Sequence, residues 1–228
     1  MTETMKKYAV IVAGGSGQRM GAVVPKQFLL LQGRPLLWHT LNTFLRSYTD
    51  IQIILVLPKA NLGEGESLRK NLNAEQKIIL TEGGNTRFQS VKNGLQLVKE
   101  PSVVFVHDGV RCLITEQLIH RCYEQALIKG SAVPVVTATD SIRIMEDEDH
   151  YVMNRSNVRI VQTPQTFQST LLLPAFEQPY DESFTDEATV VEASGENVYL
   201  IEGEYDNIKI TRPVDLLIAE RILSDRKP

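Results

Sequence analysis

The chain has 228 residues, a formal net charge of −4, and 43% hydrophobic and 23% charged residues. These values are typical of a globular protein with one α/β domain, and they exclude a disordered chain. A mildly acidic chain lacks the basic surface that non-specific nucleic-acid binding needs, so we expect no nucleic-acid partner. We expect no membrane partner either, because no apolar run approaches the ~20 residues of a membrane span. Two cysteines without a CxxC pair favour a reducing compartment, so we expect a cytoplasmic protein.

Apolar runs and helical patterns alternate along the first part of the chain. The apolar runs predict strands at 8–12, 51–57, 77–81, 103–106 and 132–136. The segments between them predict helices at 35–46, from after Pro58 to about 73, at 87–98 and at 115–129. Five strand–helix units of this kind predict an α/β fold, with a mostly parallel, Rossmann-like sheet and helices on both faces.

This alternation breaks at Thr137. Residues 141–146 and 151–154 alternate weakly around an acidic turn, which predicts a polar, protruding β-hairpin. An isolated hairpin is marginal in water and needs a surface to pack on, for which a second subunit is one candidate. We therefore interpret residues 1–228 as a single domain with 137–160 inserted as a β-arm. Helices at 171–177, 186–193 and 213–223 and a strand at 198–202 complete the prediction.

Glycines and cations gather where the predicted strands end, at the edge where ligands bind in parallel sheets. The first such loop runs Ala13-Gly14-Gly15-Ser16-Gly17-Gln18-Arg19-Met20-Gly21. Its freed N–H groups suit a phosphate. Met20 breaks the dinucleotide fingerprint, and no Gly-Lys-Ser/Thr completes a P-loop. Arg19 and Lys26 are two cations that suit a triphosphate, which carries about four negative charges. Negative charge shifts to the leaving pyrophosphate as the bond breaks, and the two cations can stabilise it. A structural turn with solvated cations is the simpler alternative.

Six segments in register extend this prediction to the whole chain. They are Ala13–Gln27 (A-G-G-x-G-x-R-M-x-x-x-x-P-K-Q), Glu82–Val91, His107–Arg111, Thr163–Phe167, Thr185–Ala188 and Asp206–Pro213. In this order they resemble the 2-C-methyl-D-erythritol 4-phosphate cytidylyltransferases of the non-mevalonate isoprenoid pathway. The resemblance implies a nucleotidyltransferase fold, a homodimer built through the arm, and Mg²⁺-dependent transfer of a cytidylyl group from CTP to that polyol phosphate.

The resemblance also implies a role for each matching residue. Arg19 and Lys26 would stabilise charge on the triphosphate in the transition state, and Arg155 and Lys209 would hold the sugar phosphate for attack. The implied nucleotide-binding residues are Ala13, Gly14, Gly15, Gly17, Gly83, Gly84, Asn85, Arg87, Ser90 and Asp108. The implied substrate-binding residues are Arg111, Ser141, Arg155, Thr185, Asp206 and Lys209. Asp108 and Asp206 are the implied metal ligands, although a strand-end Asp can also serve as a helix cap.

Two positions depart from the family pattern. Cys112 stands where the family usually has proline, and Asn85 stands where Asp is frequent. A nearby Arg would make the Cys112 thiol reactive, whereas burial would make it inert, and we favour burial.

Three other functions are compatible with parts of the sequence. A ribitol 5-phosphate cytidylyltransferase shares the fold and most loop residues and differs in the acceptor pocket and the arm. A non-catalytic nucleotide-binding regulator is disfavoured, because Arg19, Lys26 and Lys209 are all present. A sugar transferase would need a DxD metal motif at a strand end, and Asp147-x-Asp149 lies instead at the predicted hairpin tip, which we interpret as solvated.

Overall fold

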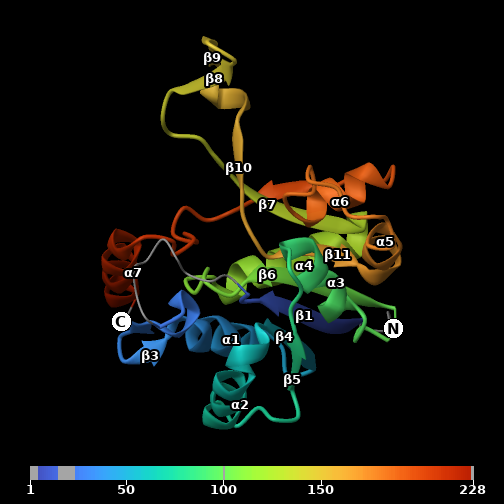
Figure 1. Ribbon diagram of the computed structural model, residues 1–228, viewed down its shortest axis with the longest axis vertical. Coiled ribbons are helices and arrows are strands. Elements are labelled where there is room, and N and C mark those ends of the chain that lie inside the picture. Colours follow the sequence, from blue (N-terminus) through green and yellow to red (C-terminus); the bar gives the residue numbers. More distant parts are fainter. Residues whose placement is uncertain (1–4, 15–23, 100, 227–228) are drawn as a thin grey trace.

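The computed structural model describes residues 5–14, 24–99 and 101–226, and its centre is one eight-stranded sheet (Figure 1). The strands follow the order β10-β7-β11-β6-β1-β4-β5, and β12 pairs with β7. Their bounds are β1 Lys6–Val12, β4 Ile51–Leu57, β5 Ile78–Glu82, β6 Ser102–Asp108, β7 Ser131–Thr137, β10 Arg159–Val161, β11 Gln165–Gln168 and β12 Leu200–Glu202.

Helices cover both faces of this sheet because the central strands are apolar on both faces. On β1, Ala9 and Ile11 face one core cluster and Val10 faces the other, as strand alternation requires. The first cluster packs against α1 (Leu36–Ser47), α2 (Leu62–Asn71) and α4 (Glu116–Lys129), and the second against α3 (Arg87–Leu95), α5 (Ser169–Ala175) and α6 (Glu187–Ala193). The α/β fold and its helical layers are therefore as predicted.

The last helix, α7 (Pro213–Asp225), forms a smaller third cluster. Its buried Ala219 packs with Leu31, Leu36 and Val110. Short elements complete this side of the fold, namely the 3-10 helices η2 (Lys26–Phe28) and η3 (Lys59–Asn61) and the paired strands β2 (Leu30–Leu31) and β3 (Arg34–Pro35). None of the helices in the described ranges is both long and apolar enough to cross a membrane.

The sheet is mostly parallel, but β10 at one edge runs antiparallel to β7, and β11 is antiparallel to both of its neighbours. β1 runs parallel to β4 and β6, and β4 runs parallel to β5. β11 enters between β6 and β7 antiparallel to both. The hydrophobic pattern does not predict β11, because its Gln165 and Thr166 are polar and yet fully buried. The burial of Gln165 depends on tertiary hydrogen bonds, such as the one from the Ala188 N–H to Gln165 Oε1 at 2.8 Å.

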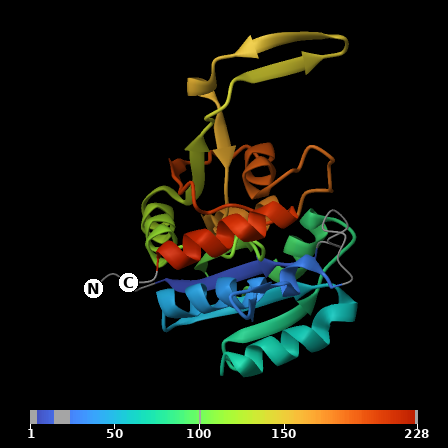
Figure 2. The same cartoon turned by 90° about the vertical axis from the view of Figure 1, so that its left-hand side faces the viewer.

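The predicted hairpin is present and projects from the body (Figures 1 and 2). It consists of β8 (Ile142–Glu146) and β9 (Asp149–Met153), which pair antiparallel with each other. Asp147 has φ 52 in the turn, and the acidic tip is exposed, as we expected of a solvated turn. The exposed apolar side chains Met145, Tyr151 and Val152 leave the hairpin without a core of its own.

Candidate active site

The loops that follow β1, β5 and β6 enclose a cavity of about 230 Å³. The register pairs Val12 at the end of β1 with Asp108 at the end of β6, so these loops meet at one edge of the sheet. The cavity is lined by Val12, Ala13, Gly14, Lys26, Gly84, Asn85, Thr86, Arg87, Ser90, Asp108, Val110 and Lys209. Most of the predicted nucleotide-binding residues lie here together. The predicted residues Gly15, Gly17 and Arg19 lie outside the described residues.

One wall of the cavity is the turn between β5 and α3, fastened by Ser90. The Gly84 N–H donates to Ser90 Oγ at 3.0 Å, and the Ser90 hydroxyl donates to the Thr86 carbonyl at 2.9 Å. The Thr86 side chain caps α3 by accepting from the Gln89 N–H. A Cβ on Gly84 would lie 2.2 Å from Gln89 Cγ, so only glycine fits this turn. The turn is therefore held in one conformation, with Gly84 at the wall of the cavity.

Opposite this turn, Lys26 opens η2 directly after Pro25. The next residue, Gln27, is buried, and its Nε2 donates to the Ala13 carbonyl at 2.9 Å. This bond joins the Lys26 segment to the end of β1. Lys26 therefore reaches the cavity from a segment anchored to the sheet.

Asp108 is the electrostatic centre of the cavity and is only 8% exposed. Its carboxylate lies 2.8 Å from Lys209 Nζ, 3.3 Å from Arg87 Nη2 and 3.9 Å from Arg111 Nε. Burial alone would raise the pKa of the Asp108 carboxyl, but the charges of Arg87 and Lys209 outweigh burial and hold this pKa well below its usual range. Asp108 is therefore ionised, and this cluster of cations suits an anionic ligand.

Behind the cavity, Arg87 also pairs with Glu187, the first residue of α6. Arg87 Nη1 donates to Glu187 Oε1, and Nη2 donates to Oε2 at 3.0 Å. Burial alone would lower the pKa of Arg87, but the Glu187 and Asp108 carboxylates outweigh burial and raise this pKa. The guanidinium is therefore charged and bridges two carboxylates.

His107, immediately before Asp108, locks the next loop. Its Nε2 lies 3.2 Å from the Arg111 carbonyl, which can only accept, so Nε2 carries the proton. The Thr163 hydroxyl then donates to Nδ1 at 3.1 Å, and its oxygen accepts the Asp108 N–H, also at 3.1 Å. Burial lowers the pKa of His107 to about 3, so the ring is neutral. Neutral His107 thus joins the Asp108–Arg111 loop to Thr163.

Arg111 lies beside the cavity with its side chain fixed. Nη1 donates to the Asn207 carbonyl at 2.7 Å, while Nε is buried without a hydrogen-bond partner and faces Asp108. A buried N–H without a partner is uncommon. Among the described residues, the only charged group facing this Nε is therefore the Asp108 carboxylate at 3.9 Å.

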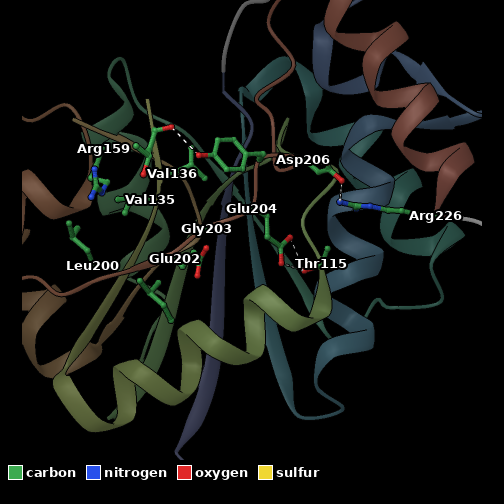
Figure 3. A pocket seen from close by; sticks show the side chains of 13 residues that line it. Thr115, Val135, Val136, Arg159, Leu200, Glu202, Gly203, Glu204, Asp206 and Arg226 are labelled. Carbon is green, nitrogen blue, oxygen red and sulfur yellow. Dashed lines mark hydrogen bonds and ion pairs between the residues drawn. The ribbon is translucent and has the colours of Figure 1, made fainter. Parts of the chain in front are cut away.

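Asp206 lines a different and larger cavity, of about 700 Å³, at β7 and β12 (Figure 3). Its carboxylate lies 3.4 Å from Arg226 Nη2 and is half-exposed. Figure 3 shows this pair on one side of the cavity and the Glu204–Thr115 hydrogen bond nearby. The structure therefore does not place Asp206 among the residues that line the Asp108 cavity.

Three further predicted substrate-binding residues also lie outside the Asp108 cavity. Ser141 and Arg155 belong to the arm. Arg155 is the first residue of the 3-10 helix η4 (Arg155–Asn157), and its Nη1 donates to the Thr139 carbonyl at 2.6 Å. Thr185 is exposed on the loop before α6. Within one chain, the arm side chains do not reach the Asp108 cavity, because the arm projects away from the body (Figure 2).

The donor set fits a magnesium ion held jointly by protein and nucleotide. In nucleotide sites Mg²⁺ is commonly bound by one or two carboxylates and by substrate phosphates. The ionised Asp108 oxygen at the mouth of the loops supplies such a hard ligand. Within the described residues, no group of three or more His, Cys, Asp or Glu side chains could hold a metal ion by itself.

Cys112 lies next to this site and is buried. Its side chain is 3% exposed and packs in the α7 cluster. Burial raises the pKa of the thiol to about 12, so thiolate is scarce at neutral pH. The expected burial of Cys112 is confirmed.

Sequence reasoning assigns no role to Glu187, His107 or Gln27, although all three lie in the matched segments. A glutamate in the first turn of a helix normally faces solvent and interacts with the helix dipole. Only the fold shows that Glu187 points inward. The signal in the sequence is weak, namely a charged residue directly before the buried apolar residues of α6.

Comparison with known proteins identifies the family. Residues 7–225 match the model of the family described as IspD: 2-C-methyl-D-erythritol 4-phosphate cytidylyltransferase. Curated relatives with that name include those of Bacteroides thetaiotaomicron, 45% identical over 96% of this chain and 100% of the relative, and of Porphyromonas gingivalis, 46% identical over 96% and 98%. The crystal structure of 4-diphosphocytidyl-2C-methyl-D-erythritol synthase from Anaerococcus prevotii superposes with a TM-score of 0.83 at 29% identity, covering 96% of each chain. The chain therefore belongs to the 2-C-methyl-D-erythritol 4-phosphate cytidylyltransferase family.

Proposed function

We propose that this chain transfers the cytidylyl group of CTP to 2-C-methyl-D-erythritol 4-phosphate, giving 4-diphosphocytidyl-2-C-methyl-D-erythritol and pyrophosphate. The observation that carries this proposal is the match to the family over nearly the whole chain. The cavity agrees with it, because a close-approach glycine turn and a cluster of cations line the same space. A flat base and a polyanion stand at the two ends of a nucleoside triphosphate.

In the proposed complex, the cytosine lies against the Gly83–Gly84 turn and Ser90. Asp108 is positioned to bind a ribose hydroxyl or a metal ion, and Arg19 and Lys26 contact the triphosphate. Mg²⁺, when bound, neutralises phosphate oxygens, and Asp108 would be its ligand from the protein. Whether Asp206 contributes depends on a movement away from Arg226, so we assign the metal to Asp108.

The reaction is a single in-line displacement. A 4-phosphate oxygen of the acceptor forms a bond to the α-phosphorus of CTP, the bond from that phosphorus to the oxygen bridging to the β-phosphate breaks, and pyrophosphate leaves with the electron pair. The attacking oxygen is already anionic, so no strong general base is needed. The residues contribute positioning and charge stabilisation, with Lys26 on the developing negative charge and Lys209 on the acceptor phosphate.

We also propose that the working unit is a homodimer in the cytoplasm. Lys209 Nζ and Arg111 Nε lie at the Asp108 cavity, but Arg155 lies on the projecting arm of the same chain. An arm from a second copy would bring Arg155, Ser141 and its exposed apolar side chains to the neighbouring cavity. A dimer thus explains why a hairpin without its own core carries predicted substrate contacts.

Pyrophosphate release tests the reaction. With CTP and Mg²⁺, release should require 2-C-methyl-D-erythritol 4-phosphate. Replacing Lys26 by Ala should reduce turnover by about a thousandfold, as loss of one charge-stabilising group does elsewhere. Full turnover by a folded Lys26→Ala variant would remove Lys26 from the mechanism.

Mixed dimers test the second subunit. Arg155→Ala and Lys26→Ala are each expected to be inactive, but a mixture should regain activity, because one of its two sites keeps both native residues. No recovery in heterodimers that have been isolated with two affinity tags would contradict the crossing arm.

A further inference from the structure

A second carboxylate lies behind the active site, on the far side of Arg87 from Asp108. Glu187 is 1% exposed at the start of α6. The helix does not use its side chain as a cap, because Asp186 accepts from the Thr189 N–H and Thr189 reciprocates. The hydrogen bonds of Glu187 go instead to Arg87.

Arg87 is held in one orientation by this pairing. Two of its nitrogens bind the two oxygens of Glu187, which fixes the guanidinium plane as well as its position. Nε and Nη2 then reach Asp108 Oδ1 at 3.4 and 3.3 Å. A buried ion pair is weak support for stability, because apolar residues of similar volume commonly do as well. The arrangement therefore calls for an explanation in the site.

That explanation lies in how the surrounding cations divide the two oxygens of Asp108. Arg87 occupies Oδ1, while Lys209 Nζ at 2.8 Å and Arg111 Nε at 3.9 Å lie at Oδ2. Three cations converge on Asp108, and Glu187 supplies the second negative charge that draws Arg87 back. Without that charge, Arg87 would be free to turn both of its terminal nitrogens to Asp108 and compete for Oδ2.

We infer that Glu187 is a positioning residue for nucleotide binding: its buried carboxylate holds Arg87 on Oδ1 of Asp108 and so leaves Oδ2 to Lys209, which keeps both cations in place at the wall of the cavity. This inference rests on the proposed function. It differs from the roles carried over by resemblance, because Glu187 does not line the Asp108 cavity and acts only through Arg87.

The Glu187→Gln variant tests this role, because it keeps the shape and removes the charge. We expect its dissociation constant for CTP, measured by calorimetry with Mg²⁺ and without acceptor, to rise at least tenfold, and kcat/KM to fall at least as much. The matched control is Val190→Ala on the same helix, a buried residue of the apolar core. That control should lower the thermal midpoint while leaving CTP affinity within twofold of the wild type.

A double-mutant cycle separates positioning from general destabilisation. In an Arg87→Gln background, Glu187→Gln should weaken CTP binding by less than threefold more, since there is no guanidinium left to position. The inference would be overturned if Glu187→Gln raised the CTP dissociation constant by the same factor in the Arg87→Gln background as in the wild type. A Glu187→Gln variant that loses thermal stability but binds CTP like Val190→Ala would also overturn it.

The conservative Glu187→Asp variant covers the case in which Glu187→Gln does not fold. It keeps the negative charge, but its side chain is one methylene shorter, so the carboxylate lies farther from Arg87. We therefore expect an intermediate loss of CTP affinity. Wild-type affinity in that variant, with Glu187→Gln unfolded, would also refute positioning. A wild-type chain that fails to bind CTP at all would instead refute the proposed function.

Discussion

The neutral, buried His107 makes a specific prediction about stability and pH. Its native pKa is about 3, against an ordinary value of 6.5, because burial opposes the charged form. Below pH 6.5 the unfolded chain binds a proton at His107 and the native chain does not. Acid therefore favours the unfolded state, and the stability that this residue contributes is lost progressively as the pH falls from 6.5 toward 3.

The magnitude follows from the pKa difference. A pH of 5 lies 1.5 units below the pKa of the unfolded histidine, whereas the native ring remains neutral at this pH. At ~1.4 kcal/mol per unit, the free energy of unfolding therefore falls by about 2 kcal/mol. Other groups titrate over the same interval, so the wild type must be compared with His107→Gln. Gln cannot take up the proton, and the shared contributions cancel in the difference.

The assay is guanidinium denaturation of both proteins at pH 7.5 and pH 5, at one fixed protein concentration because a dimer would make the midpoint concentration-dependent. Between these pH values the wild type should lose about 2 kcal/mol more unfolding free energy than His107→Gln. Equal losses would refute a neutral native His107. They would also refute the hydrogen-bond chain from Asp108 through Thr163 to Arg111 as assigned above.

Two further predictions concern the surroundings of the site. The native Cys112 thiol should fail to react with Ellman's reagent at pH 8 and react on unfolding, since burial raises its pKa to about 12; rapid native reaction at this residue, assigned by peptide mapping, would contradict the packing. Gly84→Ala should weaken CTP binding at least tenfold, because its Cβ would lie 2.2 Å from Gln89 Cγ, whereas Gly63→Ala, with no atom within 4 Å, should bind normally. Equal CTP affinities in the two variants would exclude the Gly84 turn from the nucleotide site.

The sequence was sufficient for the central sheet because its strands are apolar on both faces. Ile51–Leu57, for example, has the predicted bounds, and Thr115 caps α4 as predicted. β11 was not predicted, because its Gln165 is buried through tertiary hydrogen bonds rather than through hydrophobicity, and β10 was not predicted, because it is a short strand whose three residues are all exposed. Polar burial of this kind leaves no periodic signal in the sequence.

The predicted site residues divide in the same way. Ala13 and Asp108 lie at the ends of parallel strands, so the topology of the sheet brings them together, and the hydrogen bond from Gln27 to Ala13 brings Lys26 to them. Asp206 carries no such constraint, and its loop turns it toward Arg226 instead. The proposed role of Arg155 depends on a second copy of the chain, which no pattern within one chain specifies.

The acceptor is the central claim, and one competition reaction tests it directly. The purified chain is incubated with CTP, Mg²⁺ and equal concentrations of 2-C-methyl-D-erythritol 4-phosphate and ribitol 5-phosphate. The cytidylylated products are then separated, identified and quantified by mass spectrometry. We predict 4-diphosphocytidyl-2-C-methyl-D-erythritol as the main product, with one pyrophosphate released for each molecule formed. A product mixture dominated by cytidine diphosphate ribitol, or no cytidylylated product at all, would contradict the proposed function.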